Sequence, residues 1–317
     1  MTEPTRRTPS RRRILAGGGA LAAIATLGGW VRDLTAADLS PAARGGTTIA
    51  PMQGTAPVLF IGHGSPMNAI RDNDYSRALV AWGLALGRPK AVLMVSAHWL
   101  SERDTQVSTT ASPPLIYDFG GFPKALYEVR YPAPGAPAVA RQAADRLTAL
   151  SAPRVTGHDR QRGLDHGAWT VLRHLYPAAD VPVFQLSIDI TRPGEHHLAL
   201  GRALAGLREA GVLIIGSGNV VHNLQRTDGR QADGPRASTD WAQRFDDAVL
   251  QAVQAGDTAA LARWQGLSAG ATMAVPFPDH DVPLLYAAGA AQRCEPVRQV
   301  FEGFQAGTIS MRCMQWG

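Results

Sequence analysis

From residue 57 onward, short apolar runs alternate with longer segments of helical pattern, and this alternation most constrains the fold. The runs predict strands because they are brief and bounded by polar, Gly or Pro residues. Strands are expected at 57–61, 91–96, 105–110, 181–188, 211–215 and 307–313, and helices at 74–86, 136–150, 167–176, 194–210, 241–255, 258–264 and 282–291. This order is typical of one α/β domain with a mostly parallel central sheet flanked by helices.

Local features within this pattern carry further expectations. Asp74 is the expected N-cap of the helix 74–86, and the weakly alternating run 105–110 is expected at the edge of the sheet. Residues 111–135 are rich in Pro, Gly and aromatic residues, and they predict a long loop of the kind that is often functional. The polar, Gly-containing stretch 227–239 predicts a surface loop.

The composition is that of a globular protein. Of 317 residues, 45% are hydrophobic and 18% are charged, which suffices for a large buried core. The formal net charge is +5, but residues 1–45 hold seven arginines and three acidic residues, so they carry four of these charges. The remainder has no basic stripe, and nucleic acid is therefore not an expected partner. Beyond the N-terminal region, no apolar stretch is long enough to span a membrane.

The N-terminal segment resembles a secretion signal. Arg11, Arg12 and Arg13 precede a weakly hydrophobic run, 17–30, that is rich in Gly and Ala. This arrangement is typical of a twin-arginine signal, although a basic tail with a chance apolar stretch is the alternative. We expect 1–37 to be the signal and 38–56 a linker, with export to the periplasm. If the leader does not function, the protein stays in the cytoplasm.

The two cysteines, Cys294 and Cys313, form neither a CxxC pair nor any zinc-knuckle spacing. We expect two free or buried thiols. A disulfide between them is the alternative, and it requires an oxidising compartment.

Five of the nine histidines stand within short motifs of small residues. These motifs are Gly62-His63-Gly64-Ser65-Pro66-Met67, Ser96-Ala97-His98-Trp99, Leu164-Asp165-His166-Gly167-Ala168-Trp169, Asn219-Val220-Val221-His222-Asn223-Leu224 and Asp279-His280-Asp281-Val282-Pro283. Three of the histidines, His63, His98 and His222, follow expected strands. Ligands in open α/β sheets gather at the carboxyl ends of strands, and imidazole is the commonest protein metal ligand. The sequence therefore predicts a metal site at these strand ends.

The other four histidines, His158, His174, His196 and His197, are expected on the surface or in helix caps. The glycines of Gly216-Ser217-Gly218-Asn219 follow a strand but lack the third glycine and the acidic residue of a dinucleotide fingerprint. A nucleotide site is therefore not expected.

Over roughly residues 57–313 the chain resembles the 4,5-dihydroxyphenylalanine (DOPA) extradiol dioxygenase family. This is the class III ring-cleavage group that includes the catalytic subunit of protocatechuate 4,5-dioxygenase. Besides the first four histidine motifs, the resemblance rests on Tyr117-Asp118-Phe119 with Gly121-Phe122-Pro123, on the Pro-rich run that starts at Tyr131, and on Trp241-Ala242-Gln243-Arg244-Phe245-Asp246. Each motif is weak alone, but together they are specific.

The resemblance implies a non-haem metal ion bound by His63, His98 and His280. It makes His222 either a further metal ligand or the acid/base, and it places His166 close to the substrate. Ferrous iron is implied for activity and zinc is often the metal found bound; imidazole suits both. The last motif departs from the family, because Asp279 precedes its histidine where Glu is usual. Either neighbouring acid can orient His280, and Asp281 is an alternative third ligand.

The expected function is the opening of a catechol ring with O2 by an extradiol dioxygenase domain at 57–317. His222 or His166 is expected to accept a hydroxyl proton and later return it. The aromatic side chains of Tyr117, Phe119, Phe122 and Tyr131 either wall the substrate ring or pack the loop. The alternatives are a zinc-dependent hydrolase and a non-enzymatic metal-binding protein of the same fold. The sequence does not define an oligomeric state.

Overall fold

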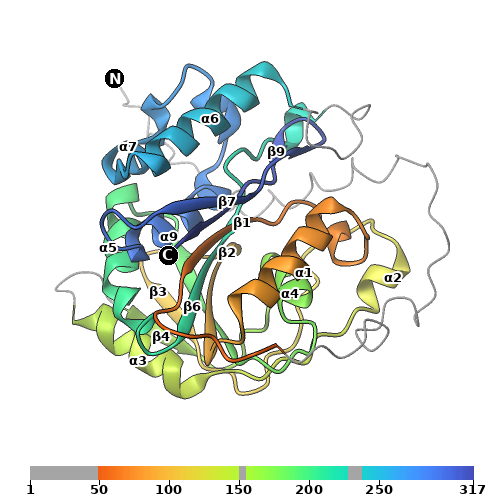
Figure 1. The fold of residues 1–317 in the computed structure, drawn as a ribbon, viewed down its shortest axis with the longest axis vertical. Coiled ribbons are helices and arrows are strands. Elements are labelled where there is room, and N and C mark those ends of the chain that lie inside the picture. The colour runs from red at the N-terminus through yellow and green to blue at the C-terminus, as the bar shows by residue number, and fades with distance from the viewer. Residues whose placement is uncertain (1–48, 150–154, 228–237) are drawn as a thin grey trace, which may run out of the picture.

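A computed structural model describes residues 49–149, 155–227 and 238–317 of the chain. Helices cover both faces of a central sheet, which gives the three layers of an α/β domain (Figure 1). The predicted signal, 1–37, and most of the predicted linker, 38–56, lie outside the described residues, so these boundaries stay predictions. Within the described part, no helix is long and apolar enough to cross a membrane.

The sheet has eight strands in the order β4-β3-β5-β2-β6-β1-β10-β7. The strands are β1 (Val58–Gly62), β2 (Ala91–Ser101), β3 (Thr105–Ser108), β4 (Val155–Asp159), β5 (Val183–Asp189), β6 (Val212–Gly218), β7 (Val297–Phe301) and β10 (Cys313–Trp316). The four central strands, β5, β2, β6 and β1, run parallel to one another. Pairing is antiparallel between β3 and β5, between β1 and β10, and between β10 and β7. The mostly parallel sheet that the sequence predicts is thus confirmed.

Among the described residues, seven helices were predicted closely, although the one expected at 194–210 ends at Leu204, and two short helices, Lys124–Tyr127 and Ala271–Ala274, were not predicted. The helices are α1 (Asp74–Leu86), α2 (Lys124–Tyr127), α3 (Pro137–Thr148), α4 (His166–Leu175), α5 (Gly194–Leu204), α6 (Asp240–Gln254), α7 (Thr258–Ala262), α8 (Ala271–Ala274) and α9 (Val282–Ala290). Short 3-10 turns stand at η3 (Pro66–Ala69), η4 (Ala205–Leu207), η5 (Leu224–Arg226), η6 (Trp264–Gly266) and η7 (Pro278–His280). The N-cap of α1 is Asn73 and not Asp74, because Asn73 and Ser76 form a reciprocal capping box.

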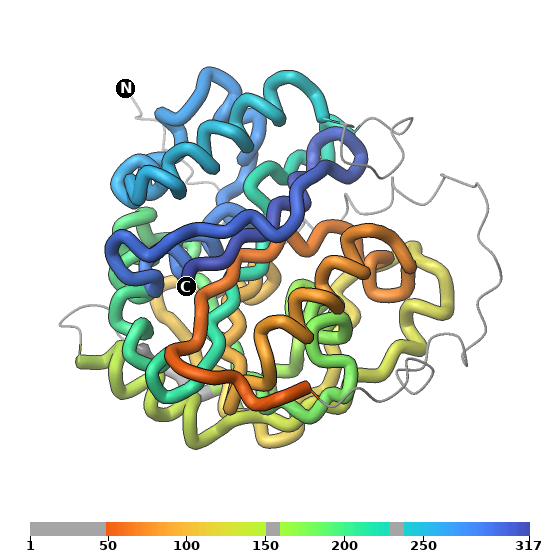
Figure 2. Tube along the Cα trace, viewed as in Figure 1, coloured from red at the N-terminus to blue at the C-terminus, as the bar shows by residue number. Residues whose placement is uncertain are grey.

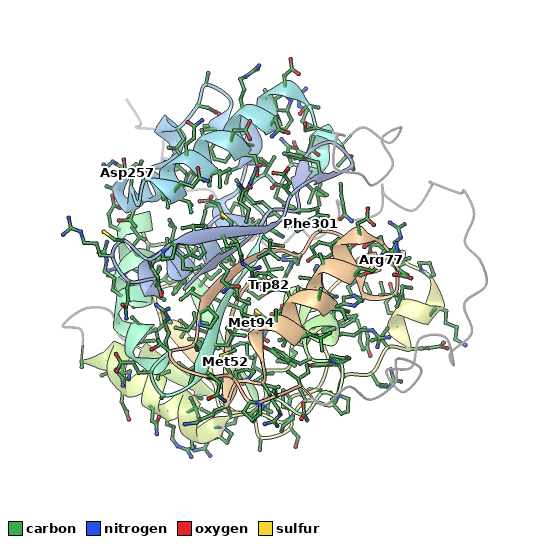
Figure 3. All side chains as sticks on the ribbon, viewed as in Figure 1. Met52, Arg77, Trp82, Met94, Asp257 and Phe301 are labelled. Atoms are coloured by element: carbon green, nitrogen blue, oxygen red, sulfur yellow. The ribbon has the colours of Figure 1, made fainter. Side chains whose placement is uncertain are left out.

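Alternate residues of the central strands feed two hydrophobic cores, one on each face of the sheet. Leu59 and Ile61 point to the core under α1 and α4, whereas Val58 and Phe60 point to the core under α5 and α9. Figure 3 shows Trp82 of α1 near Met94 of β2, and both belong to the first core. Strands buried on both faces explain the continuous apolar runs in the sequence.

Both margins of the sheet differ from the expectation. The run 105–110 is not an edge strand, since β4 pairs with β3 on its outer side. The expected strand 307–313 is instead a small two-stranded sheet of β8 (Phe304–Gln305) and β9 (Ile309–Ser310), followed by β10. Strand β10 lies beside β1, so segments from opposite ends of the described chain meet at the centre of the molecule (Figure 2).

Candidate metal centre

The sheet order brings three histidine-bearing segments together. Strands β2, β6 and β1 are neighbours and parallel, so their carboxyl ends meet at one edge of the sheet. His63 follows β1, as predicted. His98 lies inside β2 and not beyond its end, at the place where the pairing with β5 shifts register. Such irregularities re-aim side chains, which accounts for the turn of His98 toward His63.

The next histidine, His166, is the first residue of α4. The Asp165 side chain caps this helix by accepting a hydrogen bond from the backbone N–H of Ala168. Gly167 makes the approach of this helix to β2 possible, because a Cβ at that position would lie 2.5 Å from Ser96 Oγ and 3.0 Å from His98 Cδ2. Sequence and packing together therefore place His166 beside His98.

The remaining two histidines stand on the segments that follow β6 and precede α9. The backbone N–H of Asn219 donates to the carbonyl of His280 over 2.8 Å. A Cβ on Gly218 would lie 2.1 Å from that carbonyl, so a glycine is required for this contact. The backbone N–H of His222 donates to the carbonyl of Ala274. His222 and His280 then stack face to face, with ring centroids 3.6 Å apart and planes within 8°.

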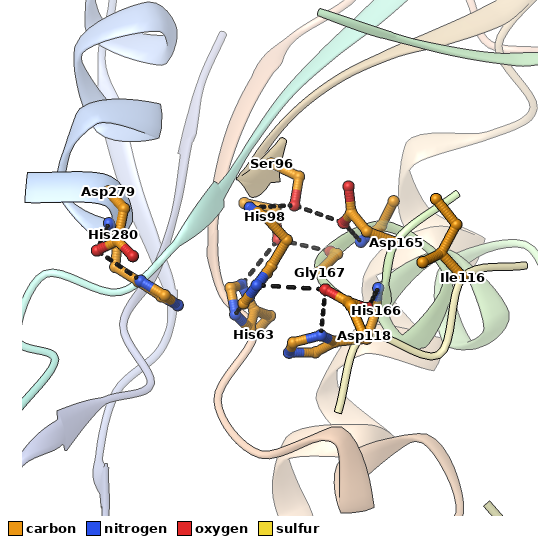
Figure 4. A network of polar contacts seen from close by, with 12 residues as sticks. His63, Ser96, His98, Ile116, Asp118, Asp165, His166, Gly167, Asp279 and His280 are labelled. Carbon is orange, nitrogen blue, oxygen red and sulfur yellow. Dashed lines mark hydrogen bonds and ion pairs between the residues drawn. The ribbon is translucent and has the colours of Figure 1, made fainter. Parts of the chain in front are cut away.

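All five predicted histidines therefore converge. Figure 4 shows the rings of His63, His98 and His166 close together, with His280 extending toward them from another segment. The ring centroids of His63, His98 and His280 are 5.0–5.3 Å apart, and the Nε2 atoms of His63 and His98 are 3.1 Å apart. The centroids of His98 and His166 are closer, at 3.9 Å.

In four of these rings, Nδ1 lies within 3.4 Å of an oxygen atom. His63 Nδ1 donates to Ser217 Oγ over 3.1 Å, since that hydroxyl itself donates to the Gly167 carbonyl. His280 Nδ1 lies 2.9 Å from Asp279 Oδ1. The Nδ1 atoms of His98 and His166 lie 3.4 and 3.0 Å from the same oxygen, Asp118 Oδ2. Ligating histidines commonly have such partners, which orient the ring and leave the other nitrogen available.

Burial keeps most of these imidazoles neutral. It lowers the pKa of His63, His98 and His222 well below the usual value, and neighbouring histidines lower it further. Burial likewise lowers the pKa of His280 to about 3. Only a neutral imidazole has a nitrogen lone pair, so these four rings are ready to bind a cation at neutral pH.

Two groups of described residues have the donor atoms to hold a metal ion. The first is His63, His98 and His166, and the second is His222, Asp279 and His280. Asp281, the alternative ligand, belongs to neither group. Its side chain is buried and burial raises its pKa to about 7, which disfavours the charged form that binds metals.

A second polar network, which sequence reasoning missed, supports the site from behind. Asp165 is fully buried and accepts hydrogen bonds from Ser96 Oγ at 2.6 Å and from Arg162 and Gln185, both at 2.8 Å. Ser96 Oγ in turn accepts from the backbone N–H of His98, and Arg162 donates to the His98 carbonyl. This carboxylate thus fixes the backbone of His98 on both sides while it caps the helix of His166.

The loop that carries Asp118 is packed by aromatic rings. Tyr117 and Phe119 both contact Trp169, and Phe119 also lies against His166 with 5.7 Å between centroids. Phe119 contacts Phe122 as well, so these residues line the side of the site that His166 occupies. Tyr131 does not line it, because it is buried in the core with its hydroxyl on the Tyr176 carbonyl.

Two of the histidines expected on the surface are buried. His174 Nε2 lies 2.8 Å from the Asn68 carbonyl, and His197 Nδ1 lies 3.2 Å from the Tyr286 hydroxyl. The expectation was wrong because α4 and α5 lie under other segments that local pattern does not reveal. His196 is half-buried, and the side chain of His158 lies outside the described part. Both cysteines are free, Cys294 exposed and Cys313 buried, as expected.

Comparisons with known proteins place this geometry in context. Residues 57–312 match the family described as the catalytic LigB subunit of aromatic ring-opening dioxygenase. The chain is 42% identical to a 4,5-DOPA dioxygenase extradiol of Escherichia coli K12 over 273 residues, which are 82% of this chain and 94% of that protein. It is 39% identical to a 4,5-DOPA dioxygenase extradiol of Beta vulgaris over 79% of this chain and 92% of that protein. The crystal structure of an uncharacterized protein from Escherichia coli K12 superposes with a TM-score of 0.70 at 37% identity, covering 83% of this chain and all of that one.

Proposed function

Because this chain belongs to the family of the catalytic LigB subunit of aromatic ring-opening dioxygenases, we propose that it opens the ring of a DOPA-like catechol at one metal ion held by His63, His98 and His280. The family match and the relatives confirm the resemblance drawn from the motifs. The chain is thus an enzyme. Its family acts on an aromatic substrate with O2, and membership of the family implies one bound metal ion. The identity of the catechol, the identity of the metal and the set of ligands are what we propose beyond family membership.

The spacing of three rings carries the proposed ligand set. Imidazoles bound through Nε2 to one ion at about 2.1 Å would have ring centroids roughly 4.6–5.3 Å apart, for angles between octahedral and tetrahedral. The centroids of His63, His98 and His280 are 5.0–5.3 Å apart, within this range for all three pairs. The second donor of each ring already faces an oxygen, so the donor set fits a metal ion.

The spacing and orientation of the rings argue against His166 and His222 as ligands of this ion. The centroids of His166 and His98 are 3.9 Å apart, which is below this range, so we leave His166 out of the ligand set although its donor atom lies near those of His63 and His98. His222 stacks on His280 in a nearly parallel plane, and the in-plane lone pairs of parallel rings do not converge. We therefore assign His166 and His222 to proton transfer, on either side of the three ligands.

Ferrous iron is the proposed metal for activity. Neutral imidazoles bind both iron and zinc, but ring opening by O2 requires a metal that can change oxidation state. When bound, the ion acidifies the catechol hydroxyls and supplies the redox chemistry with O2. The chain's own residues then accept and return protons, and Phe119 and Phe122 line the side where an aromatic ring would lie.

The proton transfers follow from the position of the two flanking imidazoles. His166 stands between Phe119 and His98, so a catechol in contact with Phe119 has a hydroxyl within its reach. Acceptance of that proton prepares the ring for attack, and His166 or His222 returns a proton as the ring opens. A positioned acid/base of this kind contributes about 10²–10⁴-fold to the rate.

The test is oxygen uptake by anaerobically iron-loaded protein with a panel of catechols that includes DOPA. We expect stoichiometric O2 consumption and a yellow ring-opened semialdehyde, with no turnover by the His98→Ala variant. A zinc hydrolase would consume no oxygen, and a non-enzymatic metal-binding protein would turn nothing over. Either result contradicts the proposed function.

We also propose that the leader exports the folded enzyme. The support is Arg11-Arg12-Arg13 ahead of the weakly apolar run 17–30, upstream of the family match at 57–312. In a host with a twin-arginine system, the full chain should reach the periplasm, and a variant with Arg11, Arg12 and Arg13 all changed to Lys should stay in the cytoplasm. Equal distribution of the two proteins between the fractions would refute export by this route.

A further inference from the structure

The motif Trp241–Asp246 contains no histidine, yet it ends in a buried carboxylate. Asp246 of α6 forms an ion pair with Arg312, and both side chains are almost fully buried. Arg312 Nε donates to Asp246 Oδ2 over 2.9 Å, and its Nη2 donates to the same oxygen. The other oxygen, Oδ1, accepts from Ser310 Oγ over 2.6 Å. Asp246 thus holds two residues of the segment 304–312, which contains β8 and β9 and which we call the C-terminal hairpin.

The C-terminal hairpin holds the backbone on both sides of His222. Before this histidine, the Val221 carbonyl accepts from the backbone N–H of Ser310 over 2.9 Å. After it, the backbone N–H of Asn223 donates to the Thr308 carbonyl over 3.1 Å, and the Thr308 hydroxyl donates to the Asn223 carbonyl over 2.8 Å. The place of His222, the proposed acid/base, therefore depends on the hairpin.

The same hairpin reaches His63 from two directions. The backbone N–H of Gly62 donates to the Arg312 carbonyl over 2.9 Å. From the other direction, Gln305 Nε2 donates to Asn68 Oδ1 over 2.9 Å, and Asn68 Nδ2 donates to the His63 carbonyl over 3.0 Å. One hairpin thus holds the backbone of a proposed metal ligand and that of a proposed acid/base.

Asp246 is the carboxylate that fixes the Arg312 side chain. Gln299 Oε1 also accepts from this guanidinium. Two further acids, Asp247 and Glu302, lie 3.8 Å from it, which is too far for hydrogen bonds, and their side chains are 50% and 72% exposed. A buried charge that loses its partner is costly, so without the Asp246 carboxylate the guanidinium should move toward these acids and water.

We propose that Asp246 is a positioning residue, which holds the C-terminal hairpin in place against the segments that carry His63 and His222. It acts through the two residues that it binds. Ser310 also bonds the segment of His222, and Arg312 also bonds that of His63. Loss of the carboxylate should therefore shift the two histidines relative to each other. The inference rests on the proposed function for the roles of these histidines, whereas the geometry of the metal site can be measured without turnover.

The test is Asp246→Asn in the full chain, read through the metal site. Asn has a single acceptor oxygen, so it cannot accept from both Ser310 and Arg312 in the present arrangement. Cobalt(II) alone serves as the probe, because its visible absorption bands depend on the geometry of its ligands. We expect changed bands and a metal affinity lowered by about 10–100-fold, the loss typical of residues that orient a ligand without touching the metal.

Glu295→Gln is the matched control, because it takes the carboxylate from another buried arginine, Arg208. Arg208 Nη1 donates to Glu295 Oε2 over 2.8 Å, and its Nε donates to the Ala56 carbonyl over 2.7 Å. Ala56 precedes β1, at the end of this strand opposite His63. Both variants should unfold at lower urea concentrations than the wild type. Only Asp246→Asn should change the cobalt bands and the metal affinity.

Kinetics of the iron-saturated enzyme give the second measurement. The kcat of Asp246→Asn should fall by about 10²-fold, the loss expected when a reacting group is displaced by an ångström. The KM for the catechol should change little, because Phe119 and Phe122, which line the proposed substrate side, are not bonded to the hairpin. Glu295→Gln should keep the kcat of the wild type.

The outcomes separate this inference from the proposed function. Wild-type cobalt bands and affinity in a folded Asp246→Asn protein would overturn the inference, whatever the loss of stability. Equal changes in Glu295→Gln would overturn it too, because they would follow from destabilisation alone. If Asp246→Asn does not fold, Ser310→Ala takes its place, and unchanged bands in that variant would overturn the inference. Changed bands in Asp246→Asn, with no ring opening by the wild type, would refute the proposed function and support positioning by Asp246.

Discussion

The Nδ1 atoms of His63 and His166 face partners that lie far away in the sequence, whereas Nδ1 of His280 faces the side chain of its own neighbour, Asp279. Ser217 is 154 residues from His63, and Asp118 reaches His166 across 48 residues of chain. The ring of His280 leans on Asp279, whose side chain is 22% exposed. The rings of His63 and His166 are therefore oriented across the folded sheet and α4, whereas the ring of His280 is oriented by a local contact, with its backbone bonded to Asn219. The fold fixes one side of the site more firmly than the other.

The largest effects on metal content and activity should come from His280 and His166. We assign His280 as a metal ligand and His166 as an acid/base that binds no metal. His280→Ala is expected to lose both bound metal and ring opening. His166→Ala is expected to retain one metal per chain and lose about 10²–10⁴-fold in kcat, because it removes an acid/base and no ligand. Metal analysis of both purified variants, alongside oxygen uptake, checks this. Metal loss in His166→Ala with retention in His280→Ala would instead make His63, His98 and His166 the ligands.

A substitution at Asp165 tests how firmly the fold holds the side of the site that carries His98 and His166. Asp165→Asn removes the charge opposite the largely buried Arg162 and should lower the free energy of unfolding by about 3 kcal/mol. Urea denaturation at constant m-value measures this change. A loss below about 0.5 kcal/mol, the size typical of surface substitutions, would mean that this network does not hold the site.

The smallest effect is expected on the second side. Asp279→Asn leaves the ligand in place but weakens its support, so metal affinity should fall by about 10–100-fold while unfolding stability changes little. Competition with a chelator of known affinity gives the value. An unchanged affinity would show that the turn, and not the Asp279 carboxylate, orients His280.

Much of the fold could be predicted because its signals are local. Continuous apolar runs predicted the central strands, and the helix 74–86 was predicted to the residue. The outer strands β4 and β7 were missed, and β7 has no fully buried residue to mark it. Burial of His174 and His197 was missed for a related reason, because it depends on segments packed over their helices.

The sequence predicted the histidines of the candidate site, but not the side chains that orient them. The five histidines stand out as motifs, and the carboxyl ends of parallel strands explain why they converge. Asp118 and Asp165 also lie within quoted motifs, but the partners of Asp118 depend on how loop 111–135 folds back on α4, and those of Asp165 on how α4 packs against β2 and β5. The only sequence signal for them was an acidic residue beside aromatic or histidine positions, which does not identify a partner.

Oxygen-isotope labelling tests the central claim most directly. Iron-loaded enzyme is supplied with a catechol under ¹⁸O₂, and the product is trapped before its aldehyde exchanges oxygen with water. Ring opening by a dioxygenase at the His63, His98 and His280 site predicts both labelled atoms in the product, with none formed by His98→Ala. Product without label, or labelled product in equal yield from His98→Ala, would contradict the account.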